Sequence, residues 1–172
     1  MPFEGVEGGT ATFVDVNGDG SQDVFLTGRD KSLTRISKLY INNGVGIYRE
    51  ATGTSFVGVD RSSVAFADLN GDTFQDLLVT GKTHDGSPVS KLYTNDGKGK
   101  FTEWTSSLLE SVESSSVAFA DVDGDMEHDL LITTNDRKDV RKAKLKHNNR
   151  GREPKFFKTR YKKGKKTKFF KN

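Results

Sequence analysis

A nine-residue motif, Asp15-Val16-Asn17-Gly18-Asp19-Gly20-Ser21-Gln22-Asp23, opens the regular part of the chain and returns at residues 68–76 and 121–129. All copies have aspartate at positions 1, 5 and 9, asparagine or aspartate at position 3, and glycine at position 4. Oxygen-bearing side chains at alternate positions of a tight turn can converge on one point, and glycine permits the bend. Carboxylates crowded in this way repel one another unless a cation neutralises them. The motif therefore predicts a site for a hard cation, with Ca²⁺ as the best candidate.

Each copy of the loop offers the oxygen ligands that Ca²⁺ prefers. Side-chain oxygens at positions 1, 3, 5 and 9, the main-chain carbonyl at position 7 and water would supply about six to eight ligands. We expect one Ca²⁺ in each of the three loops, bound most tightly in the third, which has the most carboxylates at the ligand positions. The predicted metal ligands are Asp15, Asn17, Asp19, Ser21 and Asp23 in the first loop, Asp68, Asn70, Asp72, Phe74 and Asp76 in the second, and Asp121, Asp123, Asp125, Glu127 and Asp129 in the third.

Other interpretations of the loops explain less. Segments rich in Asp, Asn and Gly also form plain turns, but three copies in register favour a metal site. EF-hand loops begin similarly, yet they require a bidentate acid at position 12 and flanking helices. Position 12 here is Leu26, Val79 or Ile132, each inside an apolar run, which excludes the EF-hand. Mg²⁺ is less suited because it retains its waters and seldom uses an all-protein loop.

The loops recur at a fixed interval, since they begin at residues 15, 68 and 121 and both intervals are 53 residues. The register extends beyond the loops: Ser-Lys-Leu-Tyr stands at 37–40 and again at 90–93, and the Asn-containing turn at 42–44 matches that at 95–97. Equal intervals without insertion indicate one structural unit repeated along the chain.

The segments of this unit have the pattern of β-strands. Residues 63–67 and 116–120, before two of the loops, alternate small side chains with larger ones. The loops are followed by short apolar runs such as Val24-Phe25-Leu26-Thr27, typical of strands buried on both faces. Two further strands joined by a tight turn are expected around 38–41 and 47–51 in the first unit, and around 91–94 and 100–105 in the second.

Four antiparallel strands in 53 residues make the unit of a β-propeller blade, so the sequence predicts an all-β fold of three four-stranded blades. Nothing has the pattern of a long amphipathic helix. The third unit degenerates, because Lys146 and Arg150 replace the tyrosine and the turn glycine of the second. The predicted boundaries are 1–53 for blade 1, 54–106 for blade 2, 107–157 for blade 3 and 158–172 for a basic tail.

The net charge of +3 combines an acidic body with a basic end. Residues 1–145 carry 15 Lys and Arg against 23 Asp and Glu, whereas residues 146–172 carry 12 Lys and Arg and one acid. The favoured interpretation of the tail is a solvated, disordered segment. The alternative is an electrostatic arm for nucleic acid, acidic glycans or an anionic membrane. The body itself is not expected to bind nucleic acid.

The remaining composition excludes several classes of function. The chain has no cysteine, which rules out thiol catalysis, zinc–thiolate sites and disulfides. No apolar run approaches the roughly 20 residues of a membrane span. The first residues carry neither a basic nor an apolar signal region, so we expect a chain made without a secretion signal or an internal piece of a longer protein.

No residues suggest catalysis, so we expect a non-enzymatic protein without catalytic residues. The histidines, His84, His128 and His147, occupy unrelated positions of their repeats and are expected in solvated loops. No Ser-His-Asp order, phosphate-binding glycine loop or nucleophile motif stands out. Trp104, the only tryptophan, is expected to pack between blades, with a glycan platform as the alternative.

The segments Ser63–Gly81 and Ser116–Thr133, together with the turns at Leu39–Gly44 and Leu92–Gly97, resemble FG-GAP/VCBS repeats, the repeats of integrin-α-like β-propellers. The resemblance covers about residues 1–145. It implies a Ca²⁺-binding blade whose loop joins the first two strands. It also implies an extracellular or cell-surface protein that works in adhesion or in protein or glycan recognition. The chain departs from the family in its tail and in having three units, where closed propellers use about four to eight blades.

Three blades cannot close a ring, and an open row leaves two blade faces bare. We therefore expect either a homo-oligomer, for instance two copies that complete one ring, or a fragment of a larger propeller. The leading hypothesis is a calcium-binding adhesion or recognition module. The alternatives are an accessory domain of a larger secreted enzyme and an anionic-polymer binder that uses the basic tail.

Overall fold

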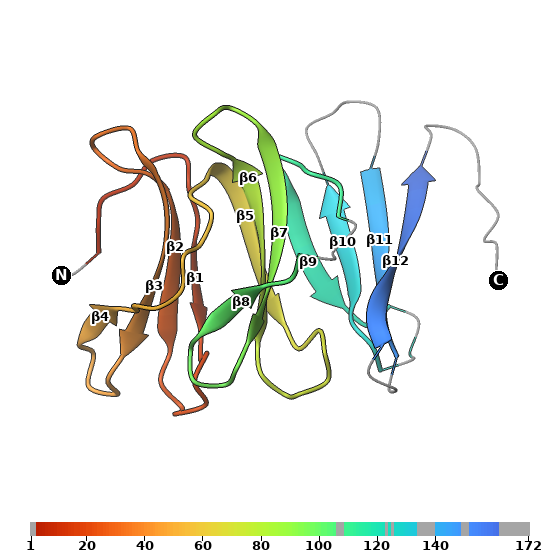
Figure 1. Ribbon diagram of the computed structural model, residues 1–172, viewed down its shortest axis with the longest axis horizontal. Coiled ribbons are helices and arrows are strands. Elements are labelled where there is room, and N and C mark those ends of the chain that lie inside the picture. Colours follow the sequence, from red (N-terminus) through yellow and green to blue (C-terminus); the bar gives the residue numbers. More distant parts are fainter. Residues whose placement is uncertain are drawn as a thin grey trace.

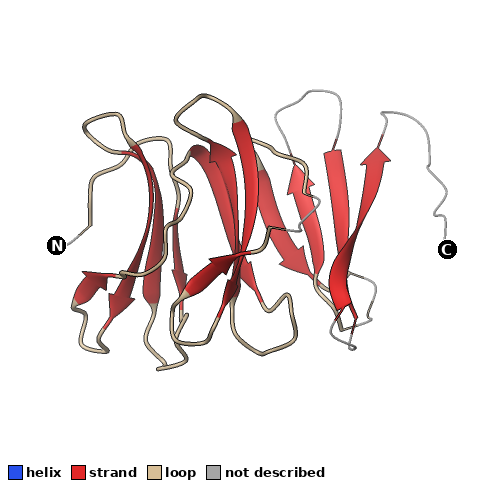
Figure 2. Ribbon diagram, viewed as in Figure 1, coloured by secondary structure: helices blue, strands red, loops and turns tan. Residues whose placement is uncertain are grey.

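The computed structural model describes residues 3–105, 109–122, 124, 126–133, 140–148 and 152–161. These residues form β-strands and loops, with no helix (Figure 2). None of them therefore belongs to a helix long and apolar enough to cross a membrane. The strands are β1 (Ala11–Val14), β2 (Asp23–Arg29), β3 (Arg35–Asn42), β4 (Tyr48–Glu50), β5 (Asp60–Ala67), β6 (Asp76–Lys82), β7 (Pro88–Asn95), β8 (Phe101–Glu103), β9 (Ser116–Ala120), β10 (Asp129–Thr133), β11 (Val140–Asn148) and β12 (Arg152–Tyr161).

The strands form three antiparallel sheets of four, each with its strands in sequence order. Sheet 1 contains β1–β4, sheet 2 contains β5–β8 and sheet 3 contains β9–β12. The sheets stand side by side in a row that follows the chain (Figure 1). The all-β prediction is confirmed, while ring closure and the number of blades in a ring stay predictions.

The strand after each loop lies at the centre of its unit. From Asp23 to Gly28 in β2, and from Asp76 to Gly81 in β6, every residue is buried, as the apolar runs predicted for strands covered on both faces. β10 differs, because Leu130 and Ile132 are buried but Leu131 remains 37% exposed. The face of sheet 3 that carries Leu131 has no following sheet within the described residues, which explains its exposure.

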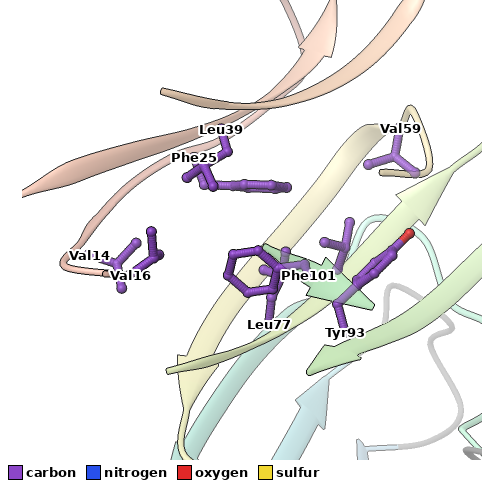
Figure 3. Packing of buried hydrophobic residues seen from close by; sticks show 9 residues of the cluster. Val14, Val16, Phe25, Leu39, Val59, Leu77, Tyr93 and Phe101 are labelled. Atoms are coloured by element: carbon purple, nitrogen blue, oxygen red, sulfur yellow. The ribbon is translucent and has the colours of Figure 1, made fainter. Parts of the chain in front are cut away.

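Sheets 1 and 2 are joined by an apolar cluster (Figure 3). The rings of Phe25 and Phe66 meet edge to face across the contact, with centroids 6.0 Å apart. Phe56 lies beside both sheets, 5.0 Å from Phe25 and 5.3 Å from Tyr93 between centroids. The buried members are Val14, Val16, Phe25 and Leu39 from sheet 1, with Val59, Leu77, Val79, Tyr93 and Phe101 from sheet 2 or the segment before it.

Sheets 2 and 3 meet through a second cluster built in the same way. Trp104 packs against its edge, half-buried, as expected of a residue between blades. The buried members are Ala67, Leu69, Leu78 and Leu92 from sheet 2, with Val112, Val117, Leu130 and Ile132 from sheet 3 or the segment before it.

Polar groups also tie the sheets together. The hydroxyls of Thr27 and Ser62 lie 2.7 Å apart between sheets 1 and 2. Asp60, almost fully buried, accepts a hydrogen bond from Nε of Arg35 at 2.7 Å. Nε of Arg29 lies 3.0 Å from the other oxygen of Asp60, an ion pair without the angle of a hydrogen bond. Two guanidinium groups thus pair with the buried carboxyl group of Asp60.

The end of the repeat region differs from the expected boundary. β12 runs from Arg152 to Tyr161 and pairs with β11 along most of its length, so the strand continues four residues past the predicted boundary at 157. Backbone pairing with β11 does not require the turn glycine or the tyrosine whose loss suggested an earlier end. The rest of the predicted tail, 162–172, lies outside the described residues.

Candidate functional site

The predicted metal loops connect equivalent strands. Residues 15–22 join β1 to β2, residues 68–75 join β5 to β6, and residues 121–128 join β9 to β10. All three connections lie at the same edge of the row of sheets, the lower edge in Figure 1. Asp123 and Asp125, two predicted ligands in the third loop, lie outside the described residues.

The first loop is organised by hydrogen bonds from its own main chain to its carboxylates. Asp15 accepts from the amides of Gly18 and Gly20, each at 2.8 Å. Asp19 accepts from the amide of Ser21 at 2.8 Å and from the side-chain amide of Asn17 at 2.9 Å. These bonds lower the pKa of Asp19, the Ser21 amide most strongly, so the carboxylate is ionised at neutral pH.

The second loop repeats this network. Asp68 accepts from the amides of Gly71 at 2.7 Å and Thr73 at 2.8 Å. Asp72 accepts from the amide of Phe74 and from the side-chain amide of Asn70, both at 2.9 Å. Thr73 has a φ of 75° where the first loop has a glycine, a conformation that costs a non-glycine residue energy.

The described part of the third loop follows the same plan. Asp121 accepts from the amides of Gly124 at 2.7 Å and Met126 at 2.8 Å. Asp129 accepts from the amide of Val122 at 3.2 Å. The first two loops and the described residues of the third therefore share these hydrogen bonds, in spite of different residues at position 6.

The aspartate at position 9 is a buried carboxyl group in each loop. Asp23 and Asp76 are fully buried, and each accepts one amide from its own loop and one from the end of the third strand. Burial raises the pKa of Asp76 to about 6, against the effect of the amides of Asn95 and Leu69, and the charges of Asp72 and Asp68 raise it further. Burial likewise raises the pKa of Asp23. Ionisation of this buried carboxyl group is therefore unfavourable, and a nearby cation would stabilise the ionised form.

The donor set fits Ca²⁺ in its chemistry, since every candidate side chain offers oxygen and the carboxylates of Asp19 and Asp72 are exposed. An ionised carboxylate can accept about four hydrogen bonds or ligand contacts, so those used by the loop amides leave capacity for a metal. In the described part of the chain, the acidic groups bind loop amides and no three of them, with or without a histidine, converge on a common point. Gathering them around an ion would require the side chains to reorient.

Two asparagines, recognised from the sequence only as turn residues, connect the loops to the next turn. The amide of Asn42 donates to Asp23 at 2.8 Å, and that of Asn95 donates to Asp76 at 2.9 Å. The side chain of Asn95 also donates to the carbonyl of Val16 at 2.8 Å, which joins the second loop to the first. Their signal was an asparagine 19 residues after each position-9 aspartate.

A groove of about 520 Å³ lies beside the loops, between the end of sheet 1 and the turn that joins β7 to β8. Its apolar side chains include Ile41 and Ile47. Arg49, Lys98 and Lys100 bring positive charge to it, and all are exposed. The groove also contains Glu50, which is paired with Lys38 at 3.1 Å; the remaining residues around it are Asn43, Ala51, Thr52 and Gly99. No repeating motif pointed to this groove, because its charges come from positions that differ between units.

The predicted loop histidines do not gather into a site within the described residues. His84 and His128 are exposed and lie in the β6–β7 and β9–β10 connections, which belong to different repeats. The side chain of His147 lies outside what the structure describes.

Comparison with known protein families identifies the repeat. A family model for the FG-GAP-like repeat matches the chain twice, at residues 15–79 and 68–132, so each match begins at a predicted metal loop. Searches of curated proteins and of solved structures returned no match. Because the two matches together cover more than half of the sequence, the chain belongs to the FG-GAP-like repeat family.

Proposed function

We propose that the chain is a non-enzymatic, calcium-stabilised β-propeller module that recognises an acidic protein segment outside the cell. The observation that carries the calcium part is the hydrogen-bonded loop found at the same edge of all three sheets. Membership of the FG-GAP-like repeat family is consistent with an integrin-like propeller module and supports an extracellular location.

Calcium would act on folding and rigidity. Asp15, Asn17, Asp19 and Asp23 would hold the ion in the first loop, with the equivalent residues in the other two. The ion's charge would neutralise the position-9 carboxylate, whose burial is unfavourable while it is ionised. Because Asp23 and Asp76 also hold Asn42 and Asn95, a metal in these loops would stabilise the turns that follow β3 and β7.

A calcium titration tests this part. We expect about three Ca²⁺ per chain by isothermal titration calorimetry, and a rise in thermal midpoint that EDTA reverses. At a free Ca²⁺ concentration of about a hundred times the Kd, one site adds about 2.7 kcal/mol of stability. Mg²⁺ at the same concentration is the control. A midpoint that responds neither to Ca²⁺ nor to EDTA would contradict the proposal.

The groove supports recognition of an acidic partner. Three exposed cations, Arg49, Lys98 and Lys100, surround apolar side chains. The ion pairs of the described residues include none of these three cations, although the Asp96 carboxylate interacts electrostatically with Lys98 and Lys100. A peptide with acidic side chains beside leucine or valine would match both features. No aromatic ring lines the groove, which favours a protein segment over a sugar.

Binding of a fluorescent peptide of alternating Glu and Leu tests this assignment. We expect Lys98→Ser to weaken binding several-fold at low salt, and the effect to shrink as salt rises. Lys31→Ser, which removes an exposed charge from the β2–β3 turn, is the matched control and should leave binding unchanged. Equal effects of both variants on peptide binding would show that the groove is not the binding site. Binding of an acidic oligosaccharide without binding of the peptide would assign the site to glycans instead.

A further inference from the structure

The two contacts between sheets are built from the same positions of the repeat. The earlier sheet contributes a trailing face, which is Val14, Val16, Phe25 and Leu39 at the first contact and, 53 residues later, Ala67, Leu69, Leu78 and Leu92 at the second. All eight are at most 8% exposed. The later sheet contributes a leading face that includes a phenylalanine of its first strand, Phe66 or Phe119. One interface is thus used twice.

Both ends of the row leave part of this interface exposed, although Val24, Leu26 and Tyr40 on the leading face of sheet 1 are buried by their own sheet and the segment before it. On the trailing face of sheet 3, Val122 is 67% exposed, whereas Val16 and Leu69 at the same position are 2% and 4% exposed. Leu131 is 37% exposed at the position where Phe25 and Leu78 are fully buried. On the leading face of sheet 1, the position of Phe66 and Phe119 is held by Phe13, which is 66% exposed.

The polar part of the interface is only partly reproduced at the two ends, because Gly9 stands where Ser62 and Ser115 supply a hydroxyl. Thr27 and Thr80 each reach a serine hydroxyl of the next sheet at 2.7 Å. Thr133, at the same position in sheet 3, bonds only within its own sheet, to the carbonyl of Ser116 at 3.4 Å, among the described contacts. Glu7, the repeat equivalent of Asp60, pairs with Arg29 at 2.9 Å, but its side chain is still 63% exposed.

We propose that the trailing face of sheet 3 in one copy packs on the leading face of sheet 1 in a second copy, head to tail. The contact would place Val122 and Leu131 beside Phe13, as Val16 and Phe25 lie in the cluster with Phe66. The occupant is a second copy because one chain carries both complementary halves, and each half has a formed counterpart inside the chain. Such a contact is heterologous, so two copies that each use both faces close a ring. The pairing uses no calcium ligand and no groove residue, although Val122 lies in the third loop beside the predicted ligand Asp121, and association is measured separately from calcium and peptide binding.

Charge introduced on either face tests the pairing. In sedimentation velocity from about 1 µM to 1 mM protein, we expect the wild type to associate, and Phe13→Asp or Leu131→Asp to raise the Kd at least about a hundredfold. Leu33→Asp, at a comparably exposed apolar residue of the β2–β3 turn, is the matched control and should associate as the wild type does. Circular dichroism of each variant verifies folding; Phe13→Ser and Leu131→Ser replace any variant that fails to fold.

Mixing the two variants distinguishes head-to-tail pairing from other modes. Phe13→Asp retains an intact trailing face and Leu131→Asp an intact leading face, so an equimolar mixture should form a dimer that grows no further. A face that pairs with its own kind would instead leave one of the two variants associating by itself as the wild type does. That result would overturn the proposal, as would a wild type that stays monomeric throughout the concentration range, or a control that dissociates like the face variants.

Discussion

Asp96 and Asn43 occupy equivalent positions in the turns after β7 and β3. Oδ1 of Asp96 accepts the amides of Lys98 at 2.9 Å and Lys100 at 3.1 Å. Oδ1 of Asn43 accepts two amides in the same pattern, at 3.2 and 3.1 Å. An uncharged side-chain oxygen is enough for this pattern of hydrogen bonds, so the charge of Asp96 makes a separate contribution to stability.

Asp96→Asn isolates that contribution. The amide of Lys98, more than any other group, lowers the pKa of Asp96, so the ionised form stabilises the fold above the unfolded pKa of about 4 and this stability is lost as pH falls through the folded pKa. We expect the variant to be less stable than the wild type at pH 7, by less than about 1 kcal/mol because solvent screens the exposed charge. The difference should vanish near about pH 2.

Urea unfolding of both proteins at the two pH values gives this comparison. Asn43→Asp is the control, since the first turn has Val45 and Ile47 where the second has two lysines. We expect Asn43→Asp to raise the free energy of unfolding by less than Asp96→Asn lowers it. A difference between wild type and Asp96→Asn that persists undiminished at low pH would contradict the role of charge.

At the residue scale, the sequence could predict which side chains stand in the loops but not how differently they are surrounded. Asp19 and Asp76 belong to the same motif, yet one is exposed with a lowered pKa and the other is buried with a raised one. The alternation of oxygen donors can be recognised within the loop sequence itself. The burial of Asp76 depends on Asn95, at the end of a strand 19 residues away.

At the element scale, the apolar contact between sheets should dominate stability. Phe25 is fully buried, and its ring meets those of Phe56 and Phe66. We expect Phe25→Ala to lower the free energy of unfolding by about 3–5 kcal/mol, because it leaves a cavity between two sheets. Chemical unfolding monitored by circular dichroism measures the loss.

Phe13→Ala is the matched control, since Phe13 is mostly exposed within one chain. We expect it to cost less than about 1 kcal/mol when the protein is dilute enough to remain monomeric. Equal losses from the two variants would show that the contact between sheets 1 and 2 does not dominate.

Strands were more predictable than their surroundings. The apolar runs identified the central strands β2 and β6, because both faces of these strands are buried and nearly all their residues had to be apolar or small. The exposure of Leu131 could not be foreseen, since its sequence context matches that of Leu78 and only the absence of a covering sheet in the described structure differs. The length of β12 was missed because backbone pairing tolerates the basic residues that suggested a tail.

At the scale of the whole molecule, the three loops should differ in calcium affinity. The third has four aspartates at its ligand positions, whereas the others have three and an asparagine. We expect Asp19→Ala, Asp72→Ala and Asp125→Ala each to remove about one Ca²⁺ per chain, and Asp125→Ala to cause the largest loss of calcium-dependent stability. Calorimetry and thermal midpoints in Ca²⁺ measure both effects. Equal losses from the three variants would reject the ranking.

The groove has walls from two repeats, because one wall comes from the end of β3, from β4 and from the residues after it, and the other from the β7–β8 turn. A single repeat therefore cannot contain such a site, and the number of such grooves in an array is set by the number of junctions between repeats. An open row has one junction fewer than it has repeats, whereas a closed ring has as many junctions as repeats. Ring closure by two copies would thus create a junction whose walls come from two polypeptides. Its combination of residues occurs at no junction within a single chain. The number of ligands bound per chain would then report whether the ring has closed.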